Sequence, residues 1–568
     1  MRTGYPRFFI HLTIQELEQE VLSRYGKDGE KTMLFPSRAT ANRCRQFFLD
    51  KEPSLASEEI RVISLVPFAQ DSVMRETQKV MSGLFCVLFP NQYNTLAKQV
   101  WQHSGDGISS RRGEFCLKAL QEGVLCREGE TFLPKQQQAR ACKGPRRYQK
   151  KESSNGVEYS NSEISVQHAS PKSPNEGKEY SQFVEERFGR NLNADLAAKA
   201  KLAIRRRIAG CLTEDVELET ALEKCEDMSG QRVQGLTEDD VFLYPTGMSS
   251  IFNTHRILMA NRAKPRKSIC FGFPYIDTLK ILEKWGPGCL FYGNGSDSDL
   301  DDLERRLEQG ERYLALFTEF PGNPLLNTPN LRRIRALADQ YDFAVVVDET
   351  IGNFINVNTL SQADVVVSSL TKVFSGDSNV MGGSAVYNPQ GRLYHSLRKT
   401  LLAEYEDDYW AEDAVFMERN SRDFISRITR VNSNAEAIAD LLHSSPLVKE
   451  IYYPKHRPSK SYYDQCRNGN GGYGGLLSVT FRHFEEAVVF FDALEVQKGP
   501  SLGTNFTLSC PFVILAHYHE LEWAAQFGVP ADLVRISIGL ENTAELKSIF
   551  ERALDVVAKL GLGKNGTV

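Results

Sequence analysis

The sequence predicts an α/β protein whose central sheet is mainly parallel, with a smaller α/β unit on each side of it. Three observations support this fold class. From residue 183 to about residue 400, short apolar runs alternate with amphipathic stretches at the spacing of a βα repeat. Most of these runs are continuously apolar, which is typical of strands that helices cover on both faces. Further strand-like runs and helical patterns flank this region on both sides.

Residues 1–126 are predicted to form a small α/β unit, an N-terminal extension to the parallel sheet. Apolar residues at helical spacing predict a helix over residues 14–22, with Thr13 and Glu16 as its capping box. Strand-like runs follow at 33–36, 60–65 and 84–90, separated by helical stretches around 40–48 and 93–101. We find no catalytic motif in this unit. Its stretch at 105–111 has two open interpretations, a ligand contact or a simple turn.

Residues 127–180 differ in composition from the rest of the chain. They are rich in Lys, Gln, Ser, Gly and Pro and have few periodic apolar positions. Because such a segment buries too little apolar surface to offset the entropy of folding, a disordered linker or insertion is predicted. Its basic stretch at 146–151 is compatible with binding to nucleic acid or an acidic partner, but a solvated linker is the preferred interpretation.

The large domain is predicted at residues 181–400 and a smaller C-terminal domain at 401–568. Predicted strands of the large domain lie at 241–244, 269–273, 289–292, 313–317, 343–347, 364–368 and 383–387. The C-terminal domain has strand-like runs at 476–481 and 533–538, and helical patterns at 485–494 and 544–557. Ligands of open α/β sheets bind beyond the carboxyl ends of the strands, so the chemistry is expected at those ends.

Composition and charge exclude several classes of protein. The chain has 568 residues, and 68 Lys and Arg against 73 Asp and Glu give a formal charge of -5. This balance supplies no overall positive field, so neither nucleic acid nor a membrane is an expected partner. The eleven cysteines include no C-x-x-C pair, and no apolar run approaches the roughly 20 residues that span a bilayer. With no signal-like stretch near the N-terminus, the expected location is the cytoplasm or the nucleus.

Two residues at neighbouring strand ends are the first candidates for chemistry. Asp348 directly follows three valines, where a buried carboxylate is costly unless a partner offsets its charge. Lys372 follows the next apolar run, between the hydroxyls of Ser369 and Thr371 and a glycine-rich stretch. A lysine amine held in a partly desolvated loop can attack a carbonyl group. Asp348 and Lys372 are therefore expected together at one edge of the sheet.

Two further strand ends supply complementary groups. Gly247 and Met248 stand in a turn that opens a helix, and the N–H groups at a helix N-terminus bind phosphate well. Tyr275 follows the next strand and can lay its ring against a flat cofactor. Each feature alone is usually a plain turn, a packing aromatic or a helix cap. Because they recur at successive strand ends of one sheet, together they predict a site for pyridoxal 5'-phosphate (PLP).

Around these residues the sequence resembles the Cys/Met-metabolism PLP enzymes, which have the fold-type I, aspartate-aminotransferase-like fold. Residues 369–383, SLTKVFSGDSNVMGG, are similar to the family's SATKYLGGHSDVMGG, and the likeness covers about residues 183–562. The resemblance implies that Lys372 is the PLP lysine, that Asp348 contacts the pyridine nitrogen and that Tyr275 stacks on the ring as a second catalytic residue. The residues implied for the phosphate are Gly247, Met248, Ser369 and Thr371.

Two more motifs concern the substrate. Residues 318–324, TEFPGNP, resemble the family's ExPxNP, which implies that Asn323 lies near the cofactor and the substrate. Residues 534–541, VRISIGLE, resemble its VRLSVGLE. Arg535, aided by Ser501, is thereby implied to bind the substrate α-carboxylate, a bidentate task that suits a planar guanidinium. A surface ion pair is the alternative role for Arg535.

The chain departs from the family pattern in places. Arg187 matches the family arginine that reaches a neighbouring subunit's phosphate, which implies a homo-oligomer, a dimer or a tetramer, but Glu185 replaces the accompanying tyrosine. Phe506 stands where the family has an acidic residue. These departures and the N-terminal extension resemble the fungal cystathionine γ-synthase branch of the family.

The activity that this resemblance implies is γ-replacement on an O-acylhomoserine, with cysteine as the nucleophile, cystathionine as the product and small amino acids as the substrates. A sulfhydrylase, a γ-lyase and a replacement enzyme with another nucleophile remain open, because the motifs do not separate them. A PLP-binding regulatory protein is a further alternative. No metal ion is expected.

Overall fold

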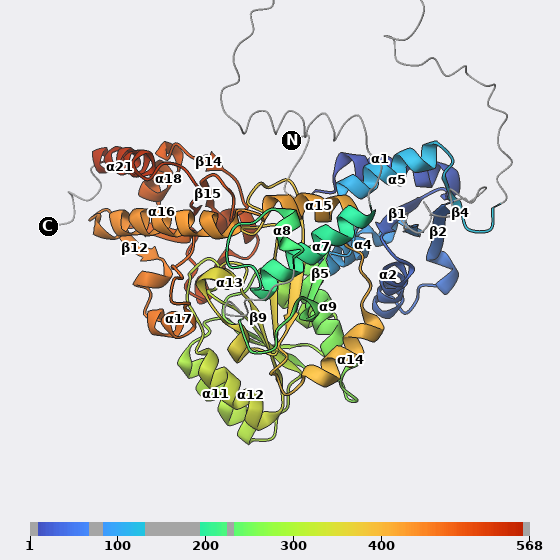
Figure 1. Cartoon of the computed structure of the whole chain (residues 1–568), viewed down its shortest axis with the longest axis horizontal. Helices are drawn as coiled ribbons and strands as arrows, with labels where there is room; N and C mark the ends of the chain where they lie inside the picture. Colours follow the sequence, from blue (N-terminus) through green and yellow to red (C-terminus); the bar gives the residue numbers. More distant parts are fainter. Residues whose placement is uncertain (1–8, 68–82, 131–193, 224–231, 561–568) are drawn as a thin grey trace, which may run out of the picture.

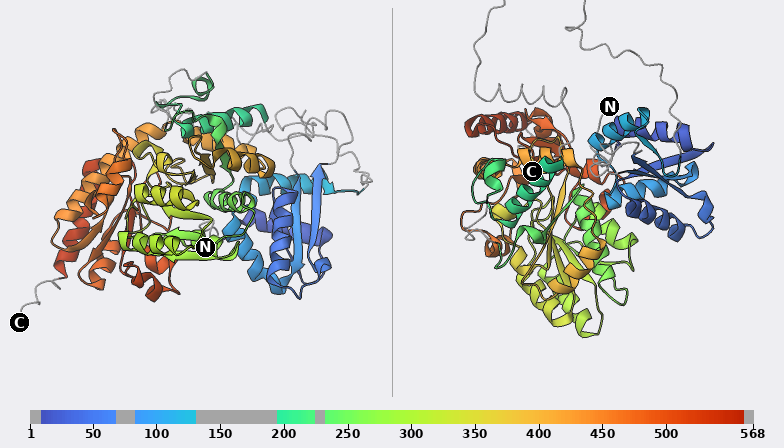
Figure 2. Two further views of the ribbon diagram at one scale, coloured as in Figure 1. Left: turned by 90° about the horizontal axis from the view of Figure 1, so that it is seen from below. Right: turned by 45° about the vertical axis from the view of Figure 1, so that its right-hand side comes forward.

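The computed structural model describes residues 9–67, 83–130, 194–223 and 232–560. These residues form three units that lie side by side, with the N-terminal unit (blue) at one end, the C-terminal unit (orange to red) at the other and the large domain between them (Figures 1 and 2). Each unit has its own sheet, of four, seven and five strands in chain order.

The N-terminal unit is an antiparallel sheet covered by helices on both faces. Its strands lie in the order β1 (Glu30–Phe35), β3 (Leu84–Pro90), β2 (Arg61–Pro67) and β4 (Leu125–Arg127). Along β3, Cys86 and Leu88 pack on one face and Val87 and Phe89 on the other. This two-sided burial explains why the run is apolar at every position. The α-helices in the described part of the unit are α1 (Leu12–Tyr25), α2 (Arg38–Lys51), α4 (Asn94–Ser104) and α5 (Ser110–Gln121).

The large domain is built on the mainly parallel sheet that the sequence predicts. Its seven strands lie in the order β5 (Val241–Tyr244), β11 (Gly383–Tyr387), β10 (Val365–Ser369), β9 (Ala344–Asp348), β8 (Ala315–Glu319), β6 (Ser268–Phe271) and β7 (Cys289–Tyr292). Only β11 is antiparallel to its neighbours. The carboxyl ends of the other six strands therefore meet at one edge.

Helices cover both faces of this sheet. Val346 of β9 packs in the cluster that contains α9 (Gly247–Ala260), α10 (Ile276–Lys284) and α14 (Tyr394–Glu404). Val345 and Val347 point to the opposite cluster. The main helices on that side are α7 (Ala194–Ala209), α11 (Asp297–Glu308), α12 (Leu331–Tyr341) and α15 (Ala411–Asn420). The valine run is thus buried on both sides, as its composition predicts.

The C-terminal unit has a mainly antiparallel sheet. Its strands lie in the order β12 (Val448–Tyr452), β13 (Leu476–Phe481), β16 (Val534–Ser537), β15 (Leu508–Pro511) and β14 (Gln497–Lys498). Its long helices are α16 (Phe424–Ser444), α18 (Phe484–Ala493) and α21 (Thr543–Lys559). Shorter helices of the chain are α8 (Leu218–Ala221), α13 (Asn353–Asn356), α17 (Lys460–Cys466), α19 (Phe512–Ala516) and α20 (Leu521–Gln526).

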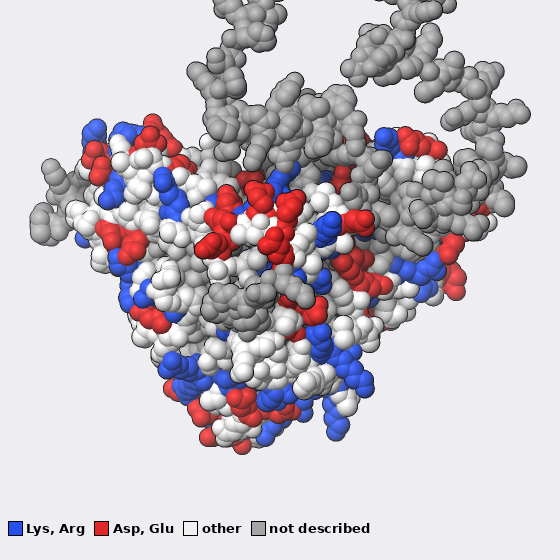
Figure 3. Space-filling view, in the orientation of Figure 1, with Lys and Arg blue, Asp and Glu red and all other residues white. Residues whose placement is uncertain are grey.

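On the face shown in Figure 3, basic and acidic side chains are interspersed, and acidic groups gather near the centre. The described residues on this face therefore present no continuous positive area. Among the residues that the structure describes, no helix is long and apolar enough to cross a membrane.

Candidate active site

A cavity of about 730 Å³ lies at the carboxyl edge of the central sheet, and all three units line it. Every predicted site residue that the structure describes is in its wall: Gly247, Met248, Tyr275, Asn323, Asp348, Ser369, Thr371, Lys372, Ser501 and Arg535. Arg187 lies outside the described residues. The residues from Gly247 to Lys372 meet here because the strands of the central sheet end at a common edge, and Ser501 and Arg535 reach the same space from the C-terminal unit.

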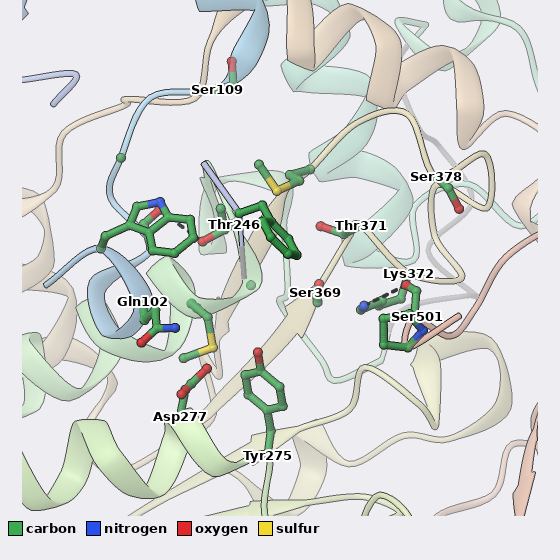
Figure 4. Close-up of a pocket in the computed structure, with 18 of the residues that line it drawn as sticks. Gln102, Ser109, Thr246, Tyr275, Asp277, Ser369, Thr371, Lys372, Ser378 and Ser501 are labelled. Carbon is green, nitrogen blue, oxygen red and sulfur yellow. Dashed lines mark hydrogen bonds between the residues drawn. The ribbon is translucent and has the colours of Figure 1, made fainter. Parts of the chain in front are cut away.

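Lys372 lies just beyond the end of β10, in a turn whose glycine, Gly376, donates its N–H to the Lys372 carbonyl at 2.9 Å. The Lys372 Nζ donates a hydrogen bond of 3.1 Å to Ser501 Oγ, which comes from the C-terminal unit (Figure 4). Gly503 allows this close approach: a Cβ there would lie 2.5 Å from the Val373 backbone nitrogen. The amine therefore faces the cavity with its position set by two units.

Asp348 and Glu319 are paired directly across neighbouring parallel strands, β9 and β8. Burial raises the pKa of Asp348, although two hydrogen bonds from Thr350 oppose this shift. Burial also raises the pKa of Glu319, to about 8, and the nearby Asp348 charge adds to that effect. A positively charged group in the cavity would offset the cost of ionising this carboxyl pair.

Thr350 connects Asp348 to the loop that carries the lysine. Asp348 Oδ1 accepts hydrogen bonds from the Thr350 backbone N–H (2.9 Å) and from its hydroxyl (2.6 Å). The same hydroxyl oxygen accepts the Ser369 N–H at 2.8 Å. The carboxyl group is thus held in one orientation, with its second oxygen left for other contacts.

Tyr275 precedes α10 and is held by Glu319, whose Oε1 accepts the Tyr275 N–H at 2.5 Å. Its ring enters the cavity with the hydroxyl pointing toward the centre (Figure 4). Glu319 Oε2 also accepts the Asn323 N–H at 2.9 Å. The carboxylate at the end of β8 therefore positions two of the predicted site residues.

The turn before α9 has the features of a phosphate site. Thr246 caps the helix by accepting the Ser249 N–H at 3.0 Å, and the first N–H groups of a helix have no partner within it. Gly247 lies so close to Ser369 that a Cβ there would be 2.6 Å from the serine Cβ. The same Cβ would lie 2.9 Å from the Ser369 hydroxyl oxygen, and Thr371 lines the same cavity. Hydroxyls and N–H groups of this kind bind phosphate groups.

Arg535 of β16 is buried, with only 3% of its surface exposed. Its Nη1 donates to Asn323 Oδ1 (3.1 Å), and its Nη2 donates to the carbonyls of Pro500 (2.6 Å) and Ser501 (3.0 Å). Its guanidinium carbon lies 4.5 Å from the centre of the Phe512 ring. A guanidinium has five N–H donors, so these three acceptors leave donors for a carboxylate ligand. A surface ion pair is not its role.

The residues present fit PLP. The cavity combines an anion-binding turn, an aromatic ring, a desolvated carboxyl pair suited to a pyridinium and a lysine amine, each supplied by a different strand end. The sequence predicts these four groups but misses Glu319 and Thr350. Glu319 could have been found by the pattern that identifies Asp348, a carboxylate at the end of an apolar strand.

The N-terminal unit also lines the cavity, through Ile10, Trp101, Gln102, Ile108 and their neighbours. Gln102 and Ser109 lie across the cavity from Lys372 and Ser501 (Figure 4). The stretch at 105–111 forms part of the wall, so a ligand contact stays a prediction for it.

Comparisons with known proteins agree with this geometry. A family model described as Cys/Met metabolism PLP-dependent enzyme matches residues 231–555, and one described as fungal trans-sulfuration enzyme, N-terminal domain, matches residues 13–109. The chain is 50% identical to a cystathionine gamma-synthase of Neurospora crassa, over 98% of this chain and 92% of that protein. It is 42% identical to a cystathionine gamma-synthase-like enzyme of Amanita muscaria, over 97% of this chain and 90% of that protein.

A solved structure, the cystathionine gamma synthase of Xanthomonas oryzae pv. oryzae, shares the fold. It superposes with a TM-score of 0.51 at 23% identity and covers 64% of this chain and 98% of its own. This chain therefore shares with that protein the mainly parallel sheet and the C-terminal α/β domain, in agreement with the fold class that the sequence predicts.

Proposed function

The chain belongs to the Cys/Met-metabolism PLP-dependent enzymes, and on that basis we propose that it joins an O-acylhomoserine to cysteine to form cystathionine. Such a reaction breaks the Cγ–O bond of the acylhomoserine, forms a Cγ–S bond to cysteine and releases a carboxylic acid. The observation that carries the proposal is the placement of Lys372, Asp348 and Arg535 in the wall of one cavity. The identity of 50% to a cystathionine gamma-synthase, over nearly the full length of both proteins, supports it.

The residues that would hold PLP follow from the contacts in the cavity. The N–H groups of Gly247 and Met248, with the Ser369 and Thr371 hydroxyls, would bind its phosphate. The Tyr275 ring would lie against the pyridine ring, and Asp348 would hold a proton at the ring nitrogen. When bound, PLP supplies a ring that accepts the electrons left when a proton leaves the substrate α-carbon.

Lys372 is the group that would move protons. Its Nζ lies 3.1 Å from Ser501 Oγ, which accepts one N–H and so orients the amine. As a neutral amine, Nζ would take the α-proton of the substrate and return a proton at the end of the reaction. Proton transfer by a positioned side chain contributes roughly 10² to 10⁴ in rate.

Arg535 would orient the amino acid. Its contacts with Asn323, Pro500 and Ser501 fix the plane of the guanidinium, and the N–H groups that these contacts leave can donate to a carboxylate that binds in this plane. Binding there would hold the α-carbon of the substrate at a set distance from the lysine loop, because Ser501 contacts both Arg535 and Lys372.

The decisive experiment is a mass-spectrometric product assay with O-acetylhomoserine, in which cysteine, sulfide or no thiol is offered in parallel. Cystathionine formed only with cysteine is the expected result. Homocysteine formed faster from sulfide would instead identify a sulfhydrylase, and 2-oxobutanoate released without thiol would identify a γ-lyase. Consumption of the acylhomoserine only in the presence of some other nucleophile would identify a replacement enzyme of different specificity.

This last activity is the second candidate because the cavity, at about 730 Å³, has an apolar part lined by Ile10, Trp101 and Ile108. An apolar lining of this kind accepts a bulkier nucleophile than cysteine. The comparison of nucleophiles in the same assay separates the two candidates.

We also propose that the enzyme is a homo-oligomer of the cytoplasm. The match of Arg187 to an arginine that serves a neighbouring subunit supports the first part. The nine cysteines in the described part of the chain form no disulfide bond with one another, which supports a reducing compartment. Light scattering after size-exclusion chromatography and localisation of a fluorescent fusion test these two points.

A further inference from the structure

We propose that the N-terminal unit is part of the cofactor site, and that its residue Asp106 positions the turn that binds the phosphate of PLP. This inference rests on the proposed function, because it concerns the cofactor of that same site. Asp106 would not touch the cofactor itself. It acts through the first two turns of α9, so it is a positioning residue.

The contacts of Asp106 carry the inference. Its carboxylate is 5% exposed, and Oδ1 accepts hydrogen bonds from Ser249 Oγ at 2.5 Å and from Asn253 Nδ2 at 3.2 Å. Both donors lie on α9, within seven residues of the cap. Oδ2 pairs with Arg43 Nη2 at 3.2 Å. The ion pair balances the charge of Asp106, so the buried carboxylate can hold α9 without repelling an anion at the helix start.

Gly105 reaches the cap of the same helix. The Thr246 hydroxyl accepts the Ser249 N–H and at the same time donates to the Gly105 carbonyl oxygen at 3.2 Å. Gly105 has a φ of 61°, and a Cβ there would lie 2.3 Å from Thr246 Oγ1 and 2.8 Å from the Ser249 nitrogen. Only glycine allows the backbone of the N-terminal unit to come this close.

The rest of the interface holds this contact in place. Arg111 donates to Asp413 at 2.9 Å and to the Asn379 carbonyl at 2.8 Å, and Phe47 stacks on Trp285 with the ring centres 4.1 Å apart. The N-terminal unit therefore has a fixed position against α9. Because the cap and the rotation of α9 set where the Gly247 and Met248 N–H groups point, Asp106 and Gly105 set the geometry of the phosphate site.

The experiment compares PLP with pyridoxal, which lacks the phosphate. Apo-protein is titrated with each ligand, and the dissociation constant is taken from the absorbance change on binding. Asp106→Ala removes both hydrogen bonds to α9, so we expect the dissociation constant of PLP to rise about tenfold or more and that of pyridoxal to change less than about twofold. Asp106→Asn keeps an acceptor for Ser249 and should restore most of the affinity for PLP.

A matched pair of glycine variants tests the same contact from the backbone. Gly105→Ala should weaken PLP binding selectively, because the new methyl group displaces Thr246 and Ser249. Gly29→Ala is its control: Gly29 has a φ of 78°, but nothing lies within 4 Å of the added Cβ. It introduces similar backbone strain in the same unit and should leave the ratio of the two dissociation constants unchanged.

Equal losses of affinity for PLP and pyridoxal in Asp106→Ala and Gly105→Ala would show a purely structural role and overturn the inference, as would unchanged binding of both ligands. A wild-type protein that binds neither ligand would overturn the proposed function and, with it, this inference. A wild-type protein that binds PLP while the variants match it would overturn the inference alone.

Discussion

Lys372 Nζ and Ser501 Oγ lie 3.1 Å apart, and this hydrogen bond joins the large domain to the C-terminal unit at the reacting end of the cavity. Gly503 brings the two loops together by its lack of a side chain. Arg535 holds the carbonyl of the same serine at 3.0 Å. The position of the amine therefore depends on how the C-terminal unit packs against the large domain.

Ser501→Ala should lower kcat about tenfold, because Lys372 loses the acceptor that orients its amine. The affinity for PLP should change little, since Ser501 lies away from the phosphate turn. Steady-state kinetics and a PLP titration check both parts. Ser433→Ala, at an exposed position of α16, is the control. An unchanged kcat would exclude an orienting role for Ser501.

Lys372→Ala should abolish covalent retention of PLP after borohydride reduction and lower kcat/KM by roughly 10² to 10⁴ or more, because the base that moves the α-proton is lost. Peptide mass mapping of the reduced protein locates the modified residue. Lys399→Ala, at an exposed lysine of α14, should retain PLP as the wild type does. Turnover at the wild-type rate by the variant that lacks Lys372, or retention of PLP after reduction, would refute the assignment.

Asp348→Asn should stabilise the apo-protein at alkaline pH while it lowers activity. Burial raises the folded-state pKa of Asp348, and it raises that of Glu319 to about 8. The folded protein therefore binds more protons than the unfolded protein above about pH 4, and its free energy of unfolding falls as the pH rises toward 8. An asparagine removes one buried charge and still accepts both Thr350 hydrogen bonds. At pH 8 we expect the Tm of the variant to exceed that of the wild type, by roughly 2–4 °C for each kcal/mol gained in the free energy of unfolding. This difference in Tm should shrink as the pH falls toward about 4.

The measurement is calorimetry of both apo-proteins across this pH range. A Tm difference that is constant with pH would show that the charge of Asp348 is not the cause. With PLP bound, the sign should reverse, since the asparagine cannot hold a proton at the pyridine nitrogen.

Arg535→Lys should raise the KM for the acylhomoserine roughly 10- to 100-fold, because an ammonium group cannot make two parallel hydrogen bonds to a carboxylate. The PLP content should stay normal, as measured by absorbance of the purified protein. Loss of PLP together with the rise in KM would point to a collapse of the loop at Pro500 and Ser501 instead.

Arg187 lies outside the described residues, and a mixing experiment tests its predicted role toward a neighbouring subunit. Arg187→Ala and Lys372→Ala should each be weakly active or inactive alone. Co-expressed, they should recover roughly a quarter of the wild-type activity, because one site of each mixed dimer combines an intact lysine with an intact arginine. No recovery, with mixed oligomers present, would place Arg187 in its own subunit's site.

Much of the fold could be predicted because the composition of a strand indicates which of its faces are buried. The valines of β9 alternate between two clusters, so an all-apolar run correctly predicts helices on both faces. The direction of β11 could not be predicted in this way, since a strand buried on both faces has the same pattern in either direction. The helix α5 was also missed, because its buried positions are mainly small, such as Gly113, Cys116 and Ala119.

The sequence by itself determined the family and the cofactor and predicted which lysine holds it, because these inferences depend on short motifs whose residues are neighbours along the chain. Only the tertiary structure decided that Ser501 orients Lys372, that Glu319 positions Tyr275, and that Asp106 and Gly105 hold α9. These contacts join residues 44 to 147 positions apart. Local patterning specifies which face of each element is buried, but the packing of the three units selects which polar side chains meet.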